Sequence, residues 1–243
     1  MKLKMKTEFK QLDKLINLNE PEIIAFNGLK SVDMLTGDIA NNICLNQGKE
    51  VLELVSHKKE YLIKRLVINQ ADVNYKNWYL KAYNDNELKH IALSTINLFE
   101  TTTRLPTIVE TEIMELKDII HYIENYANTY ADRDIIDTLI VLDMFPLNDG
   151  YILGNSRRDK RYKRESIKLI KSISKICKKL RCPLIFVYFG DINEIIKYID
   201  KYVIMKQKEL ESGTMILEVH TKNEIIGTCD LRYDFKYRKF ENI

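Results

Sequence analysis

The sequence lacks the features that mark several large classes of protein. No apolar run approaches the roughly 18–20 residues that cross a bilayer. The basic start, MKLKMKTEFKQ, has no apolar segment after it that would make it a signal peptide. We therefore expect a cytoplasmic protein with no membrane partner.

Cysteine and proline are also scarce, and their positions exclude further classes. The four cysteines have no CxxC spacing, which argues against a zinc site or a disulfide framework and for a reducing compartment. The four prolines lie beside or at the ends of predicted strands, and no Pro/Gly/Ser linker, internal repeat or low-complexity tract interrupts the chain. A length of 243 residues with 45% apolar residues fits one large α/β domain. We predict a single domain over residues 1–243.

Short apolar runs alternate with helical patterns along the chain. The predicted strands cover 22–27, 50–55, 107–110, 138–143, 184–189, 202–205, 215–220 and 225–233. The predicted helices cover 32–46, 58–67, 84–99, 115–130 and 161–180. This alternation indicates an α/β fold with a mostly parallel central sheet flanked by helices. The last strands have no helices between them, which predicts an antiparallel C-terminal extension at the edge of the sheet.

The stretch EIIAFNGLKSVDMLTGDIANNI begins like a phosphate loop but lacks its lysine. A working loop reads GxxxxGK[ST], in which backbone N–H groups and the lysine hold the phosphates. Counting from Gly28 puts Asp33, Met34 and Leu35 in the place of Gly-Lys-Thr, and a second register, ending on Thr36-Gly, also lacks the lysine. As an N-cap, Asp33 would stabilise the helix by about 0.5–2 kcal/mol, yet it would repel a triphosphate. The segment alone favours an ordinary capped turn.

A second segment favours the interpretation of the first as a nucleotide loop. The buried apolar run DTLIVLDMF ends its predicted strand on Asp143. In P-loop ATPases an aspartate in this place holds the magnesium ion. An aspartate that merely opens a loop after a strand is common, but a strand, turn and helix followed by such a strand is more suggestive.

In order and spacing, five segments together resemble the RecA-like motor domain of DnaB-type replicative helicases. They are TEFKQLDKLINLNEPEIIAF, IANNICLNQGKEVLELVS, DTLIVLDMFPL, ISKICKKLRCPLIFVYF and TKNEIIGTCDLRYDFKYRKFENI. The resemblance runs over the full chain and implies a RecA-like, P-loop-NTPase-type fold and a place in DNA replication. The helical N-terminal domain of the family has no counterpart here. For an active member, the resemblance implies ATP with Mg²⁺ as cofactors.

The departures from this family fall on its chemistry. Ser56 or His57 stands where the family has its catalytic glutamate, and Phe189 replaces the sensor glutamine. The Lys-x-Arg that reaches a neighbouring subunit's γ-phosphate reads His-Thr-Lys and ends on Lys222, which lacks the planar fork of arginine. An arginine finger alone is worth roughly 10³–10⁵ in rate. These losses predict a degenerate member without ATPase activity and without a cofactor.

The residues that remain define the predicted sites. Asp143 is the one residue left of the catalytic set. The degenerate nucleotide site comprises Gly28, Lys30, Asp33, Thr36 and Lys222. A predicted DNA-binding cluster in a loop after the Asp143 strand comprises Arg157, Arg158, Lys160, Arg161, Lys163 and Arg164. Clustered Lys and Arg with one aromatic suit phosphate contacts, although a solvated helix N-terminus explains the cluster equally well. The family's second DNA loop is short here.

Three functions stay open at this point. The first is a non-catalytic helicase-like protein that binds a replicative helicase, another replication protein or further copies of itself. The second is an active ATP-dependent, 5′–3′ DNA helicase that uses an unrecognised lysine such as Lys30. The third is a simple single-stranded-DNA-binding module using residues 157–164. We rank them first, third, second.

Overall fold

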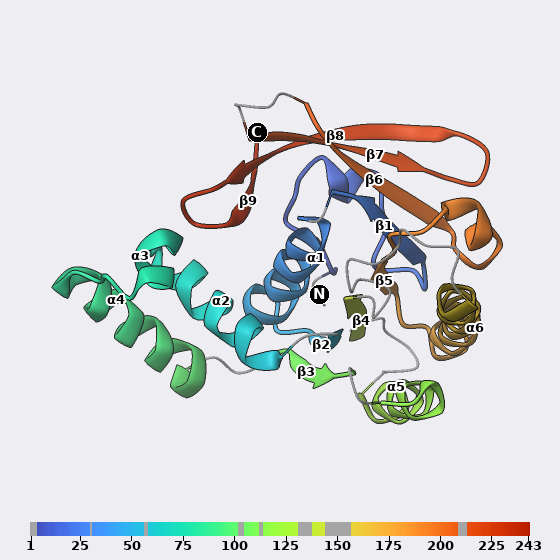
Figure 1. Ribbon diagram of the computed structural model, residues 1–243, viewed down its shortest axis with the longest axis horizontal. Helices are drawn as coiled ribbons and strands as arrows, with labels where there is room; N and C mark the ends of the chain where they lie inside the picture. The colour runs from blue at the N-terminus through green and yellow to red at the C-terminus, as the bar shows by residue number, and fades with distance from the viewer. Residues whose placement is uncertain are drawn as a thin grey trace.

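The computed structural model describes residues 4–29, 31–55, 58–101, 105–111, 114–130, 138–143, 157–208 and 213–243. Among these residues, nine strands form one sheet in the order β3-β2-β4-β5-β1-β6-β7-β8-β9 (Figure 1). The strands are β1 (Ile23–Gly28), β2 (Glu50–Val55), β3 (Thr107–Glu110), β4 (Thr138–Asp143), β5 (Leu184–Val187), β6 (Lys201–Gln207), β7 (Thr214–His220), β8 (Ile225–Asp234) and β9 (Lys239–Asn242). Strands β1 to β6 pair in parallel, and the antiparallel extension begins at β7. The predicted fold class is confirmed.

The helices cover both faces of the parallel part of the sheet (Figure 1). They are α1 (Val32–Asn41), α2 (Lys59–Ala71), α3 (Tyr75–Leu80), α4 (Asp85–Ile96), α5 (Leu116–Tyr130) and α6 (Arg157–Leu180). Helix α1 lies on one face and α5 with α6 on the other, while α2, α3 and α4 extend away from the sheet. In the described parts of the chain, no helix is long and apolar enough to cross a membrane.

Two hydrophobic cores form because successive strand residues point to opposite faces. In β1, Ile24 and Phe26 pack in the core beneath α1, whereas Ile23 and Ala25 pack in the core beneath α5 and α6. Strands β4 and β5 divide their residues in the same way. All these side chains are essentially inaccessible to solvent, which explains why the central strands read as continuous apolar runs.

Several predicted boundaries are wrong. The predicted helix 58–67 spans Lys59–Ala71, whereas the predicted helix 32–46 has the predicted extent and closes in a π-helical turn, Asn42–Asn46. Helix α6 begins at Arg157 rather than at residue 161, so the basic cluster predicted as a loop forms the first turns of a helix. The sequence pattern does not predict strand β9, which pairs antiparallel with β8.

The pairing register defines two edges of the parallel sheet. Gly28 lies beside Met205 at the edge where the parallel strands end, which we call the carboxyl edge. Helix α1 starts there. Tyr202 lies near the opposite, amino edge, where it pairs with His220 at the end of β7. Any site at the ends of these strands therefore faces one of two well-separated edges.

Candidate functional site

Gly28 ends β1 at the carboxyl edge, where a nucleotide loop would start. Its φ is +120°, and a Cβ built on it would lie 2.2 Å from the Met205 carbonyl oxygen. The Leu29 N–H donates to that same oxygen at 3.4 Å. The close approach of β6 therefore requires glycine at this position, whether or not a phosphate binds.

The turn after Gly28 bonds its backbone donors within the chain. The N–H of Val32 donates to the Leu29 carbonyl (2.9 Å), and the N–H of Leu35 donates to the Ser31 carbonyl (3.3 Å). The N–H of Met34 donates to Ser31 O (3.1 Å) and to Asp33 Oδ1 (2.7 Å). The Val32 and Met34 N–H groups are first-turn donors of the kind that a phosphate loop leaves free for its ligand, whereas the Leu35 bond is the first i→i−4 bond of the helix. Lys30 lies outside the described residues.

Two residues of the predicted degenerate site have local roles in α1. The prediction that Asp33 is the N-cap is wrong, because Ser31 occupies that position without a side-chain cap bond and Asp33 lies in the first turn. Its carboxylate is still favourable near the positive end of the helix dipole. Thr36 is fully buried, and its hydroxyl donates to the Asp33 carbonyl at 3.0 Å.

A buried ion pair that the sequence did not reveal lies just beyond this turn. Arg65 of α2 places its Nη2 2.6 Å from Asp38 Oδ1 and donates to the Met34 carbonyl at 2.6 Å. The other Asp38 oxygen accepts the N–H of Phe240 at 3.1 Å. The two charged side chains are only 8% and 10% exposed. The pair therefore ties α1, α2 and β9 together.

The ionisation of this pair follows from its surroundings. Burial raises the pKa of the Asp38 carboxyl, and the attraction of Arg65 opposes that effect. Burial alone would lower the pKa of Arg65, but the carboxylates of Asp38 and Asp33 more than offset it, and the pKa is raised. Gly37 makes room for the guanidinium, since a Cβ there would lie 3.1 Å from Arg65 Nη1. A glycine inside a predicted helix is costly, and it was the one available signal of this contact.

The structure does not bring all predicted site residues together. Asp143 ends β4 at the carboxyl edge, opposite Val55 of β2, and β5 separates β4 from β1; its side chain lies outside the described part, as do Ser56 and His57. Lys222 is exposed in the turn after β7, at the amino edge, far along the strand direction from Gly28.

The described backbone places the basic cluster 157–164 at the start of α6, which follows β4 in the chain. The side chains of Arg157, Arg158, Lys160, Arg161 and Lys163 lie outside the described residues, and Arg164 is exposed. Phe189, where the family has its sensor glutamine, packs against the core beneath α1. The structure thus gathers Gly28, Asp33 and Thr36 at one turn and leaves Lys222 at the other edge.

Comparisons with solved structures identify the fold. The ATPase domain of a DnaB-like helicase superposes with a TM-score of 0.78 at 12% identity, over 100% of this chain and 92% of that one. A second DnaB-like replicative helicase, described with its interactions with primase, superposes with a TM-score of 0.72 at 11% identity, over 100% of this chain but 62% of its own length. The RadB recombinase gives a TM-score of 0.59 at 12% identity, over 98% and 99% of the two chains. No protein-family model and no curated protein matches the sequence. These likenesses establish a RecA-like fold.

Proposed function

We propose that this chain is a helicase-like domain of DNA replication that has lost ATP hydrolysis and acts by binding other macromolecules. The observation that carries the proposal is the turn after Gly28. The N–H groups of Val32 and Met34 are bonded within the turn and the first turn of α1, so a triphosphate would have to break those bonds to enter. The Asp33 carboxylate would add repulsion. These residues do not fit ATP with Mg²⁺.

The charge balance beyond the turn supports the same proposal. Phosphoryl transfer depends on positive groups that stabilise developing negative charge. Arg65, the buried cation in α2, is bound to Asp38 and to the Met34 carbonyl. Releasing it would leave Asp38 buried without its partner, which costs about 3–5 kcal/mol. Arg65 is therefore a structural residue and is not available to a phosphate.

A protein partner is supported by the apolar surface of α4. A capping box of Asn84 and Glu87 starts this helix, and its inner side packs against α2. Four large apolar residues on α4 and the π-helical turn that continues it are 45–58% exposed, which are Leu88, Leu93, Ile96 and Phe99. They lie on an element that projects from the sheet (Figure 1). Neighbouring exposed apolar residues of this kind mark interaction sites. We define them as the α4 stripe and propose that it contacts a replication protein.

Single-stranded DNA binding is a second candidate, favoured by one observation. The basic cluster forms the first turns of α6, where the positive end of the helix dipole adds to six positive charges. Such a concentration of charge destabilises an isolated helix and is offset when phosphates bind. Binding through this cluster would weaken steeply as salt increases, and replacing its arginines with glutamine would remove it.

Two measurements test the proposal. A fluorescent ATP analogue titrated with Mg²⁺ should not bind the full chain at millimolar concentration. Size-exclusion chromatography with a purified replicative helicase should show a complex that is lost in L93E/F99E, while K76E/K89E, which changes the charge at exposed positions of α3 and α4, should retain it. Saturable nucleotide binding would contradict the loss of the site. Equal behaviour of the two variants would contradict the α4 stripe.

A further inference from the structure

A cleft of about 270 Å³ opens at the amino edge of the sheet, opposite the carboxyl edge. It lies between the N-terminal segment, the turn that follows it and the first residue of β6. Its lining residues are Lys4, Met5, Lys6, Asp13, Lys14, Leu15, Ile16, Asn17, Asn19 and Lys201. Nothing in the proposed function uses this cleft.

The N-terminal wall of the cleft is fixed by side-chain amides. Asn19 accepts the Met5 N–H at 2.8 Å and donates to the Met5 carbonyl at 3.1 Å. Gln47 holds Lys6 in the same way, at 3.0 Å and 2.7 Å. Met5 is buried, while Lys4 and Lys6 are exposed. Two lysines are thus presented on a backbone that is held on both its donor and its acceptor groups.

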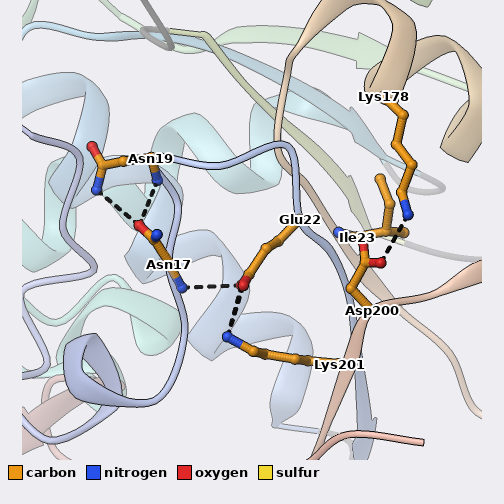
Figure 2. Close-up of polar contacts among 7 residues, drawn as sticks. All are labelled: Asn17, Asn19, Glu22, Ile23, Lys178, Asp200 and Lys201. Atoms are coloured by element: carbon orange, nitrogen blue, oxygen red, sulfur yellow. Dashed lines mark hydrogen bonds and ion pairs between the residues drawn. The ribbon is translucent and has the colours of Figure 1, made fainter.

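Three other lining residues, Asn17, Asn19 and Lys201, belong to a polar network centred on Glu22 (Figure 2). Glu22 accepts the Lys201 ammonium at 2.8 Å and 3.0 Å and also the N–H of Asn17 at 3.0 Å. The Asn17 oxygen in turn accepts two bonds from Asn19, at 3.1 Å and 3.3 Å. Lys201 and Glu22 are only 17% and 19% exposed. Glu22 therefore neutralises the charge of Lys201, and the side-chain oxygens of Glu22 and Asn17 already accept hydrogen bonds.

The described side chains that line this cleft offer more donors than acceptors. Lys4, Lys6 and Lys14 are exposed, and among the described residues none of them has an acidic partner. The Nδ2 group of Asn17 donates no hydrogen bond to any described residue. Asp13 is the one acidic residue among the described lining residues, and its Oδ1 accepts hydrogen bonds from the N–H and the hydroxyl of Thr7, at 2.6 Å and 2.8 Å. Three unpaired lysines and the Asn17 amide therefore line the cleft, against one carboxylate whose Oδ1 already accepts two bonds.

We propose that this cleft binds the phosphate groups of an anionic ligand. A ligand in a site of free donors must bring acceptors and few donors of its own, and a phosphate oxyanion does so. A peptide would bring N–H groups that find few side-chain acceptors here, and each costs about 1–3 kcal/mol if buried without a partner. No aromatic side chain is among the described residues that line the cleft, so it offers no platform for stacking a base. It therefore recognises the phosphates and not the groups attached to them.

The test is calorimetric titration of the full chain with inorganic pyrophosphate at low salt. We compare wild type with K4Q/K6Q/K14Q and with a matched control, K76Q/K81Q/K89Q, which removes the same charge from exposed positions in and beside α3 and α4. Wild type and control should bind alike, and the cleft variant at least about ten-fold more weakly, as expected for losing charge-assisted contacts. No binding to wild type, or equal weakening in both variants, would overturn the proposal.

Competition distinguishes the source of the phosphate. A dT15 oligonucleotide that displaces pyrophosphate from wild type, with the same loss in K4Q/K6Q/K14Q, assigns the site to a nucleic-acid backbone. Failure of dT15 to displace it assigns the site to a free oligophosphate or a phosphorylated small molecule. Both results support phosphate recognition. Poly-glutamate that binds this cleft more tightly than pyrophosphate would overturn it, because carboxylates would then be the preferred ligand.

Discussion

The two edges of the sheet differ in whether their polar groups are already satisfied. At the carboxyl edge, N–H groups of the turn after Gly28 bond within the chain, and Arg65 is bound to Asp38. At the amino edge, Lys4, Lys6 and Lys14 stand around a cleft with no acidic partner among the described residues. The fold is shared with the compared ATPase domain, yet the cleft that we propose binds phosphate lies at the amino edge, and the basic cluster 157–164 begins α6 after β4. Fold predicts where a site can lie, and we propose that the unpaired lysines determine where this chain binds an anion.

The largest expected effect comes from breaking the ion pair at the carboxyl edge. Arg65→Met leaves Asp38 buried without its cation and should lower the free energy of unfolding by about 3–5 kcal/mol, measured by urea denaturation. The double variant D38N/R65M should recover part of this loss because no isolated charge remains. A single variant with wild-type stability would mean that Arg65 is free to serve a ligand, and the comparison of the two edges would fail.

The next effect separates packing from phosphate binding at Gly28. Gly28→Ala should cost about 3 kcal/mol or more, because the new Cβ meets the Met205 carbonyl at a φ of +120°. Gly48→Ala is the matched control: its φ is also positive, but no atom lies within 4 Å of its Cβ. It should cost about 1 kcal/mol. Equal costs in urea denaturation would show that β6 does not impose glycine at position 28.

A smaller effect should appear in alkaline solution. Burial raises the pKa of Tyr233 to about 12, above the value of about 10 expected in the unfolded chain. The folded state then holds this proton more tightly, so its contribution to stability is complete below about pH 10 and is lost as the pH rises toward 12. Tyr233→Phe should reduce the fall in melting temperature over this interval. An unchanged pH profile would show that Tyr233 ionises as freely in the folded state.

The smallest effect on stability should come from the amino edge. K4Q/K6Q/K14Q removes exposed side chains with no described ion pair and should change the free energy of unfolding by no more than about 0.5 kcal/mol. Urea denaturation of this variant beside K76Q/K81Q/K89Q checks the expectation. A loss of several kcal/mol would mean that these lysines hold the fold together, and they would then not be free donors awaiting a ligand.

Much of the fold was predictable from the sequence because its central strands are buried on both faces. Strands β2, β3 and β4 have the predicted bounds. Runs such as TLIVLD are apolar over nearly their whole length, so the beginning and end of the strand are clear in the sequence. Strand β9 is not evident in the sequence because, of its four residues, only Phe240 is buried. The N–H of Phe240 in this strand donates to Asp38, which lies 202 residues earlier in the chain, and a local sequence pattern cannot predict such a contact.

The candidate sites were less predictable because they depend on long-range contacts. The sequence pattern marks Gly28, but the Met205 carbonyl that requires it lies on β6. Apart from the glycine at position 37, whose missing side chain makes room for it, nothing in the pattern singles out Arg65, since a basic residue in a helix usually faces solvent. For the amino-edge lysines the sequence indicates only a basic N-terminus, because the Asn17, Asn19 and Glu22 network that shapes their cleft forms by folding.

The most direct test of the proposed function is phosphate release from Mg²⁺-ATP by the full chain, with and without single-stranded DNA. We predict no release above background in either condition, because the N–H groups of Val32 and Met34 are already bonded within the chain. DNA-stimulated turnover that disappears in Lys30→Ala would contradict this prediction. The turn would then have to open for nucleotide, and the chain would be an active helicase motor.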